Sequence, residues 1–293
     1  MVSKARISNL TGWVTTLFFL IRNRGRKTYG HQTIHKLVER YIYENCQDIS
    51  EYQAAEKVVE HFIATLSPRK ESNLSRIGPD FDAGYIGALN PLPKYLISGG
   101  AGKNIDFEVA LAERGVVIHL FDHTVRTLPK QDINLIHHKK GLFAKITRVQ
   151  NSISLDEIVA MVPQNEKEKM WLKLDIEGSE WELLAEKIEV LNRFDQIFIE
   201  FHDTYKLTDS RFRSDFTKIF NYLNTNFDLI SVSSNNWQGT TNFGRTFIPT
   251  TFEVTYIKKR KGYPRRTGSD YKKFMFVNNA NRLPIPEIPF RIM

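Results

Sequence analysis

The 293-residue sequence has a single cysteine, Cys46, and it lacks any run of about 18 consecutive apolar residues, the length that a membrane-spanning helix needs. One cysteine cannot form an internal disulfide or a multi-cysteine zinc module, and it favours a reducing compartment. Without a long apolar run, a conventional membrane span is excluded. Together, these two absences predict a cytoplasmic protein.

A strong excess of one charge is also missing. The 41 Lys and Arg against 33 Asp and Glu give a formal net charge of +8, and hydrophobic residues make up an ordinary globular 41%. Six basic residues lie within residues 258–266 (Lys-Lys-Arg-Lys-Gly-Tyr-Pro-Arg-Arg). We interpret this segment as a solvated loop or a patch for an acidic substrate, with nucleic acid as the less favoured partner.

The longest apolar stretch, residues 13–21, is too short to cross a bilayer and is followed by four basic residues within 22–27. As a helix it would reach only about 14 Å, half of a hydrocarbon core. Arginines and a glycine follow it where a secretory signal would have small residues for cleavage. Residues 13–27 therefore indicate either peripheral membrane contact or a helix packed on the main domain or on a partner chain, as in a homodimer.

Residues 31–66 show the apolar spacing of two helices. In the second helix Ala55, Val59 and Phe62 share a face with Val58, Ile63 and Leu66, and Pro68 follows. We divide the chain into an N-terminal helical extension (1–70), a catalytic domain (71–260) and a basic, proline-containing tail (261–293).

From residue 95 the pattern alternates between strands and helices, which predicts an α/β fold with a parallel sheet covered by helices on both faces. Five strands are expected at 95–98, 116–121, 133–137, 171–174 and 194–201. Two more, at 227–232 and 251–257, have no helical pattern between them. This order resembles the Rossmann-like seven-stranded sheet of class I methyltransferases, in which the last strand is antiparallel, whereas a dehydrogenase would continue with parallel units.

A glycine-rich segment, Gly99-Gly100-Ala101-Gly102, follows the first of these strands. At this place an open α/β sheet binds a nucleotide, because the backbone can approach the ligand closely. Asp122, at the end of the next strand, is placed to accept both ribose hydroxyls. A third glycine for a pyrophosphate is missing, and Asp106 and Glu108 near the helix start would repel a pyrophosphate but tolerate a cationic sulfonium.

These features favour S-adenosylmethionine over a dinucleotide. The predicted cofactor-binding residues are Gly99, Gly100, Gly102, Asp106, Asp122, His123, Thr124 and Asp175.

Three segments resemble the motifs of FkbM-type methyltransferases. Residues 98–108 (Ser-Gly-Gly-Ala-Gly-Lys-Asn-Ile-Asp-Phe-Glu) with 121–124 (Phe-Asp-His-Thr) resemble the family's first two motifs. Residues 173–180 (Lys-Leu-Asp-Ile-Glu-Gly-Ser-Glu) resemble its Lys-x-Asp-x-Glu-Gly-x-Glu motif. An upstream element at 76–85 is similar as well, with Ala83 in place of a glycine.

The resemblance covers roughly residues 76–257. It implies a class I fold and S-adenosylmethionine-dependent methyl transfer, commonly to a hydroxyl of a sugar or a secondary metabolite. An acceptor that is a small molecule or a glycan is therefore the expectation.

Carboxylates and a histidine gather at the ends of the fourth and fifth strands, where this fold places its ligands. A hydroxyl acceptor must lose its proton, so the predicted catalytic residues are Asp175, Glu177, Glu200 and His202. We expect Asp175 at the acceptor or methionine end, Glu177 orienting the loop on an extended backbone, and His202 as a base. Ser179 is expected to open the next helix with a capping box, and Glu180 to stabilise the helix dipole.

The same strand ends leave the metal requirement open. Asp175, Glu200 and His202 have ligand types that could hold a divalent cation such as Mg²⁺, although no dedicated metal spacing is present. Two other functions are weighed: a non-catalytic S-adenosylmethionine-binding scaffold, and, less favoured, an RNA methyltransferase. The latter lacks an Asn-Pro-Pro-Tyr-type segment that would hold a flipped-out base.

Overall fold

The computed structural model describes residues 40, 48–66, 68, 73–80, 83–102, 104–128, 134–145, 151–162, 169–235, 239–259 and 291–292. The chain divides into two compact units, residues 1–49 and 50–293, and the description below concerns the second. The predictions for residues 13–27, for the first N-terminal helix and for nearly all of the basic segment and tail lie outside the described residues. Within the described part, no helix is long and apolar enough to cross a membrane.

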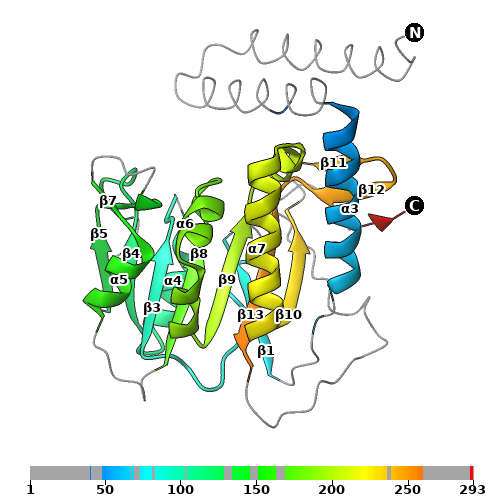
Figure 1. Cartoon of the computed structure of the whole chain (residues 1–293). Helices are drawn as coiled ribbons and strands as arrows, with labels where there is room; N and C mark the ends of the chain where they lie inside the picture. Colours follow the sequence, from blue (N-terminus) through cyan, green and yellow to red (C-terminus); the bar gives the residue numbers. More distant parts are fainter. Residues whose placement is uncertain are drawn as a thin grey trace, which may run out of the picture. The chain divides into compact units, whose positions relative to one another are not determined.

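A seven-stranded sheet with the order β10-β13-β9-β8-β3-β4-β5 forms the centre of the main unit (Figure 1). Its strands are β3 (Tyr95–Gly99), β4 (Val117–Phe121), β5 (Leu135–His138), β8 (Met170–Leu174), β9 (Gln196–Phe201), β10 (Phe227–Ser234) and β13 (Phe252–Lys258). The first five are parallel, and β13 runs antiparallel to both β9 and β10. The predicted Rossmann-like methyltransferase sheet, with its antiparallel closing strand, is confirmed.

Helices cover both faces of this sheet. One face packs against α3 (Ile49–Thr65), α5 (Leu155–Met161), α6 (Glu180–Glu186) and α7 (Ser210–Asn226), with short 3₁₀ helices at Ile188–Arg193 and Thr204–Thr208. The other face packs against α4 (Asp106–Ala112) and a hairpin of β1 (Leu74–Ile77) and β2 (Tyr85–Ala88). The strands are buried on both faces, which is why they read as continuous apolar runs.

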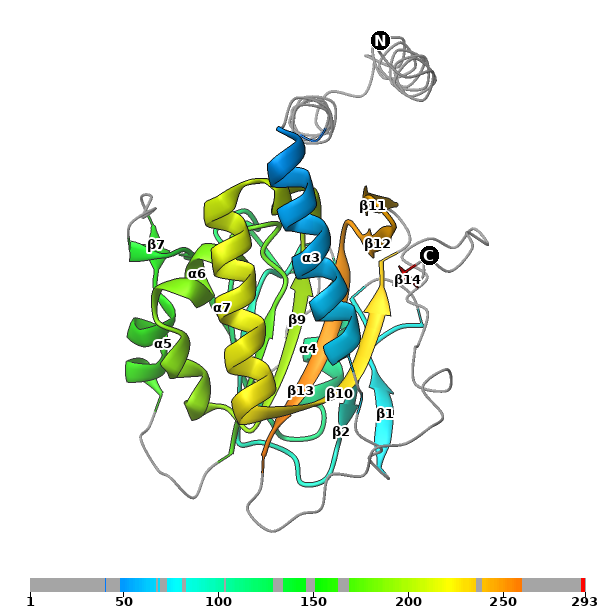
Figure 2. The ribbon, with the colours of Figure 1, turned by 45° about the vertical axis from the view of Figure 1, so that its right-hand side comes forward.

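The second N-terminal helix is confirmed as α3, whose buried residues are Ala55, Val59 and Phe62. It lies alongside α7 in Figure 2. The Phe62 ring contacts Phe216 and Phe220 of α7 at centroid distances of 5.1 and 4.5 Å and Phe252 of β13 at 5.7 Å. Helix α3 is therefore part of the core of the main unit.

Three small sheets were not predicted. The β1–β2 hairpin is one of them; the second pairs β6 (Gly141–Leu142) with β7 (Ser152–Ile153), and the third joins β11 (Thr240–Phe243), β12 (Thr246–Pro249) and β14 (Arg291–Ile292). The hairpin is fixed to the main sheet because the Thr255 hydroxyl of β13 donates to the Ile86 carbonyl of β2 at 2.7 Å. It places Tyr85 beside the carboxyl ends of the central strands.

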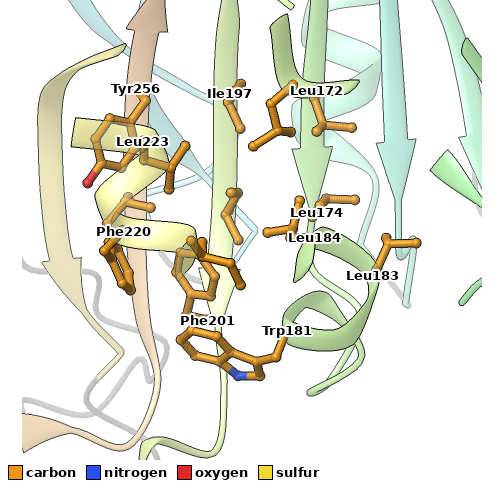
Figure 3. Packing of buried hydrophobic residues seen from close by; sticks show 14 of the residues in the cluster. Leu172, Leu174, Trp181, Leu183, Leu184, Ile197, Phe201, Phe220, Leu223 and Tyr256 are labelled. Carbon is orange, nitrogen blue, oxygen red and sulfur yellow. The ribbon is translucent and has the colours of Figure 1, made fainter. Parts of the chain in front are cut away.

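An aromatic cluster supports the ends of the central strands from the helical side (Figure 3). The indole of Trp181, on α6, stacks on Phe201 of β9 at a centroid distance of 4.4 Å. Its Nε1 donates to the carbonyl of His202 at 2.7 Å. Through this bond the apolar core fixes the backbone immediately after β9, where the polar site begins.

Candidate active site

The glycine-rich loop after β3 has the geometry of a close backbone approach. Gly100 has φ +84°, and a Cβ on it would lie 1.7 Å from the carbonyl oxygen of Asp175. The Gly102 backbone has φ +52° with open space around a Cβ position, while a Cβ on Gly99 would meet the Leu142 side chain at 2.2 Å. The sequence requires glycine at position 100 for packing against β8 as well as for its backbone angle.

Asp122, the predicted ribose ligand, joins this loop to the end of β4. Its Oδ2 accepts hydrogen bonds from the amides of Ala101 (2.9 Å) and Gly102 (3.2 Å). Its Oδ1 accepts from the amide and hydroxyl of Thr124 and from the Val125 amide. Burial alone would raise the pKa of Asp122, but these hydrogen bonds outweigh it and lower the pKa.

The remaining predicted cofactor residues surround this junction. Asp106 is the first residue of α4, and its amide is bonded to the Asn104 side chain at 3.0 Å. His123 and Thr124 are exposed just after β4, with the His123 ring 5.7 Å from that of Phe143. The structure therefore places Gly102, His123 and Thr124 as exposed residues just after β3 and β4, with Asp122 buried between the two loops.

A buried lysine connects the glycine-rich loop to the catalytic candidates. Lys173 Nζ donates to the Gly100 carbonyl at 2.7 Å and lies 3.5 Å from Glu108 Oε1 and 3.6 Å from Asp175 Oδ2. Glu108 also accepts from the Ser98 hydroxyl at 2.6 Å. Burial would lower the pKa of Lys173, but the nearby carboxylates outweigh it and raise the pKa. Lys173 therefore stays charged inside the core.

Asp175, Glu200 and His202 come together at the ends of β8 and β9. One ligand-type atom from each of the three side chains lies within 4.8 Å of the others. Within this cluster, Nε2 of His202 lies 3.6 Å from Glu200 Oε2. Glu200 Oε1 accepts from the Asn235 side chain at 2.8 Å, and Tyr85 donates to Asp175 at 3.3 Å.

The turn after β8 differs from the expectation in two ways. The backbone is not extended through Glu177, which has φ +56° in a turn and an exposed side chain, so the structure places it apart from the three clustered residues. Ser179 forms no side-chain cap on α6, so the predicted capping box is wrong. The Ser179 backbone has the helical angles φ −79° and ψ −10° instead of the extended angles of an N-cap. The Glu180 carboxylate turns inward and accepts from the backbone amides of Gly178 (2.9 Å) and His202 (2.6 Å).

Glu180 also holds the His202 ring. Its Oε1 lies 3.1 Å from Nδ1, and both side chains are almost fully buried. Burial would lower the pKa of His202, but Glu180 first and then Glu200 and Asp175 raise it well above the ordinary histidine value. Burial raises the pKa of Glu200 strongly, whereas Lys173 and His202 outweigh burial at Asp175 and lower its pKa. The three shifts therefore share one physical cause, the burial of several ionisable groups against one another.

Comparison with known protein families identifies the family of this chain. Residues 83–229, half of the chain, match the FkbM methyltransferase domain. The chain belongs to the FkbM methyltransferase family. The matched range contains the glycine-rich loop, Asp122 and all three clustered residues.

Comparison with solved structures finds weaker likenesses to the FkbM chain. Fibrillarin from Methanococcus jannaschii, a pre-rRNA processing protein, is 10% identical, with 58% of this chain and 68% of that chain covered and a TM-score of 0.33. Sp1610 from Streptococcus pneumoniae, solved with S-adenosyl-L-methionine, is 11% identical, with 60% and 70% covered and a TM-score of 0.29. No curated protein matches. The fold assignment therefore rests on the strand order of the sheet.

Tyr85 and Lys173 were not predicted as functional residues, while Glu108 and Glu180 were noticed only for their charge near a helix start. A charged residue inside an apolar strand (Trp-Leu-Lys-Leu) is the one local signal for Lys173, because a buried lysine requires carboxylate partners. Tyr85 and Glu180 act through contacts distant in sequence, and their local patterns indicate a strand residue and a helix-start charge.

Proposed function

We propose that this FkbM-family chain is an S-adenosylmethionine-dependent O-methyltransferase. Its acceptor would be a hydroxyl of a saccharide, a glycoconjugate or a secondary metabolite. The observation that carries the proposal is the ionised Asp175 directly beside the glycine-rich loop, with its amide bonded to the Gly99 carbonyl at 3.0 Å. A methyl donor on the loop and a proton acceptor at the end of β8 would then be neighbours.

The loop region supports the methyl donor. Backbone at Gly100 and Gly102 can approach the ligand without a Cβ, and Asp122 lies where the ribose hydroxyls would exchange for some of its present hydrogen bonds. Asp106 lies at the start of α4, and His123 and Thr124 are exposed just after β4. The negative charge of Asp175 near Gly100 favours a cationic sulfonium over an anionic pyrophosphate.

The chemistry needs alignment and one proton acceptor. A lone pair of the acceptor oxygen forms a bond to the methyl carbon while the carbon–sulfur bond breaks, and its electrons leave on sulfur as S-adenosylhomocysteine. The hydroxyl proton passes to the carboxylate of Asp175, whose side chain is 21% exposed. His202, predicted as a base, has Nδ1 at 3.1 Å from Glu180 and Nε2 at 3.6 Å from Glu200, so in this proposal it positions Glu200.

Binding of the methyl donor is tested by calorimetry with S-adenosylhomocysteine and with NAD. The parent chain should bind S-adenosylhomocysteine and not NAD, and Asp122→Ala should lose that binding. Glu113→Gln, an exposed change at the opposite end of the sheet, is the control that keeps it. Binding of NAD by the folded parent chain, or of neither ligand, would overturn the proposal.

Methyl transfer is tested with radiolabelled S-adenosylmethionine and a panel of polysaccharides, glycolipids and RNA. Asp175→Asn should slow transfer by about 10²- to 10⁴-fold, the usual contribution of a positioned base. Cofactor binding without transfer to any acceptor would favour a non-catalytic scaffold. Salt-sensitive transfer to RNA would favour the RNA methyltransferase.

Three further expectations stay predictions: a homodimer, peripheral membrane contact through residues 13–27, and a cytoplasmic location.

A further inference from the structure

We propose that Asp175, Glu200 and His202 bind one divalent metal ion of the Mn²⁺ or Zn²⁺ class. The ligand-type atoms of these three residues lie within 4.8 Å of one another, at the ends of adjacent strands. Ligands about 2.1 Å from a common ion in tetrahedral geometry lie ~3.4 Å apart. The 3.6 Å between His202 Nε2 and Glu200 Oε2 already has this spacing.

The imidazole is oriented as a metal ligand would be. Glu180 occupies Nδ1 of His202, so Nε2 is the nitrogen that faces Glu200. Glu180 is itself fixed by two backbone amides, and it is fully buried. A carboxylate on the second nitrogen of a ligating histidine is the usual arrangement that sets its tautomer and ring orientation.

The charge around the cluster also calls for a cation. Glu108 has Lys173 as its cationic neighbour, and Glu180 has His202. Asp175 and Glu200 share these same two basic groups, at 3.6 Å from Lys173 Nζ and 3.6 Å from His202 Nε2 respectively, so four carboxyl groups surround one lysine and one histidine. Ligand-type oxygens of Asp175 and Glu200 lie within 4.8 Å of each other, and two ionised carboxylates this close repel each other unless a proton or a cation lies between them. A metal ion can take the place of that proton.

The donor set indicates the class of metal. Two carboxylates would suit Mg²⁺ or Ca²⁺, whereas an imidazole nitrogen favours Mn²⁺, Fe²⁺ or Zn²⁺. The notion of Mg²⁺ that the sequence suggests is therefore replaced in this proposal by a softer ion. Its role rests on the proposed function and changes one step of it: Asp175 would bind the ion instead of accepting the proton. The ion would bind the acceptor oxygen and lower the pKa of the hydroxyl, whose proton would leave to water.

Direct metal binding tests the site without any assay of activity. After treatment with EDTA, the full chain is titrated with Co²⁺ and followed by visible absorption, and Mn²⁺ is counted by electron paramagnetic resonance. One equivalent should bind, and pulsed resonance on the Mn²⁺ form should show coupling to one imidazole nitrogen. The pulsed-resonance measurement uses the parent chain, so its result is valid even if the variants fold poorly.

Variants then identify the ligands. Asp175→Asn, Glu200→Gln and His202→Gln should each weaken Co²⁺ binding by more than tenfold, and Glu180→Gln by about 10- to 100-fold, as expected for a residue that orients a ligand. Glu113→Gln, an exposed carboxylate at the C-terminal end of α4, is the control and should bind Co²⁺ as the parent does. Equal binding by parent and His202→Gln would overturn the proposal.

S-adenosylhomocysteine binding on the same samples separates this inference from the proposed function. A chain that binds S-adenosylhomocysteine but neither Co²⁺ nor Mn²⁺ would overturn the metal site and leave the methyltransferase proposal standing. A chain that binds the metal through the three residues but not S-adenosylhomocysteine would support the site and overturn its methyltransferase role. Binding of Mg²⁺ in clear preference to Mn²⁺ and Co²⁺ would overturn the assigned class.

Discussion

Individual residues at this site act mainly by fixing the charge of their neighbours. Lys173 is almost fully buried, yet its amine reaches the Gly100 carbonyl and the carboxylates of Glu108 and Asp175. A buried charge is retained only when partners compensate its desolvation. Because one of these partners belongs to the glycine-rich loop and another to the catalytic cluster, this lysine ties the two halves of the site together.

Gly100 and Gly102 offer a matched pair of substitutions at the residue scale. Both have positive φ, which costs an alanine about 1–2 kcal/mol, but only at Gly100 does a Cβ meet the Asp175 carbonyl. In urea unfolding, Gly100→Ala should therefore be clearly less stable than Gly102→Ala. Gly102→Ala should stay folded but bind S-adenosylhomocysteine more weakly than the parent, because the proposed function places the ligand against the Gly102 backbone. Equal stability losses would contradict the packing argument.

At the scale of elements, local sequence patterns predicted a helix start correctly where the hydrogen-bond partner of the capping residue is near in sequence. Ser154 opens α5 as predicted, because its amide donates to Glu157 three residues later at 2.9 Å. The same pattern at Ser179 failed: its backbone is already helical, and Glu180 accepts from the amide of His202 just after β9. The distinction lies in contacts of 22 residues' separation, which periodicity and capping rules do not contain.

The edge of the sheet at β4 and β5 predicts a pH dependence of stability. His119 Nδ1 and His138 Nε2 lie 3.1 Å apart with stacked rings, and burial lowers the pKa of both below the ordinary 6.5. His138 is lowered further by His119, Lys140 and His137. In the unfolded chain both histidines have the ordinary pKa, so they take up protons at a higher pH than in the folded chain. The stability contributed by keeping them neutral is therefore fully present above pH 6.5. It is lost as the pH falls towards their folded-state pKa values.

Urea unfolding at pH 7.5 and pH 5.5 measures this loss. The slope contributed by each proton is at most about 1.4 kcal/mol per pH unit. His119→Gln/His138→Gln should flatten the acid side of the profile, whereas His123→Gln, whose ring is exposed, should leave it unchanged. A double variant with the parent's slope would show that other groups control the acid limb.

For the whole molecule, the sequence was sufficient for the sheet order and for the strand ends at which the site lies. Alternation of apolar runs with helical stripes predicts parallel strands, and parallel strands bring their carboxyl ends to one edge. Asp175, Glu200 and His202 were predicted from that rule and do meet. The β1–β2 hairpin, which supplies Tyr85, was missed because a four-residue strand carries too little periodicity to be recognised.

For the entire chain, we predict where the folded unit begins. The sequence-based boundary lies at residue 70, but α3 packs its Phe62 against α7 and β13. A chain that begins at residue 48 should keep the full-length melting temperature and S-adenosylhomocysteine affinity. One that begins at residue 70 should lose both, because each buried apolar side chain of α3 contributes about 1.5–3 kcal/mol.

Phe62→Ala in the full chain provides the control for this truncation. It should cost about 3–5 kcal/mol of unfolding free energy, as large-to-small changes of buried aromatics do. His61→Ala, an exposed neighbour on the same helix, should cost little. If the chain that begins at residue 70 instead folds with full stability and affinity, α3 is an accessory to the methyltransferase unit. The boundary drawn from the sequence would then be the functional one.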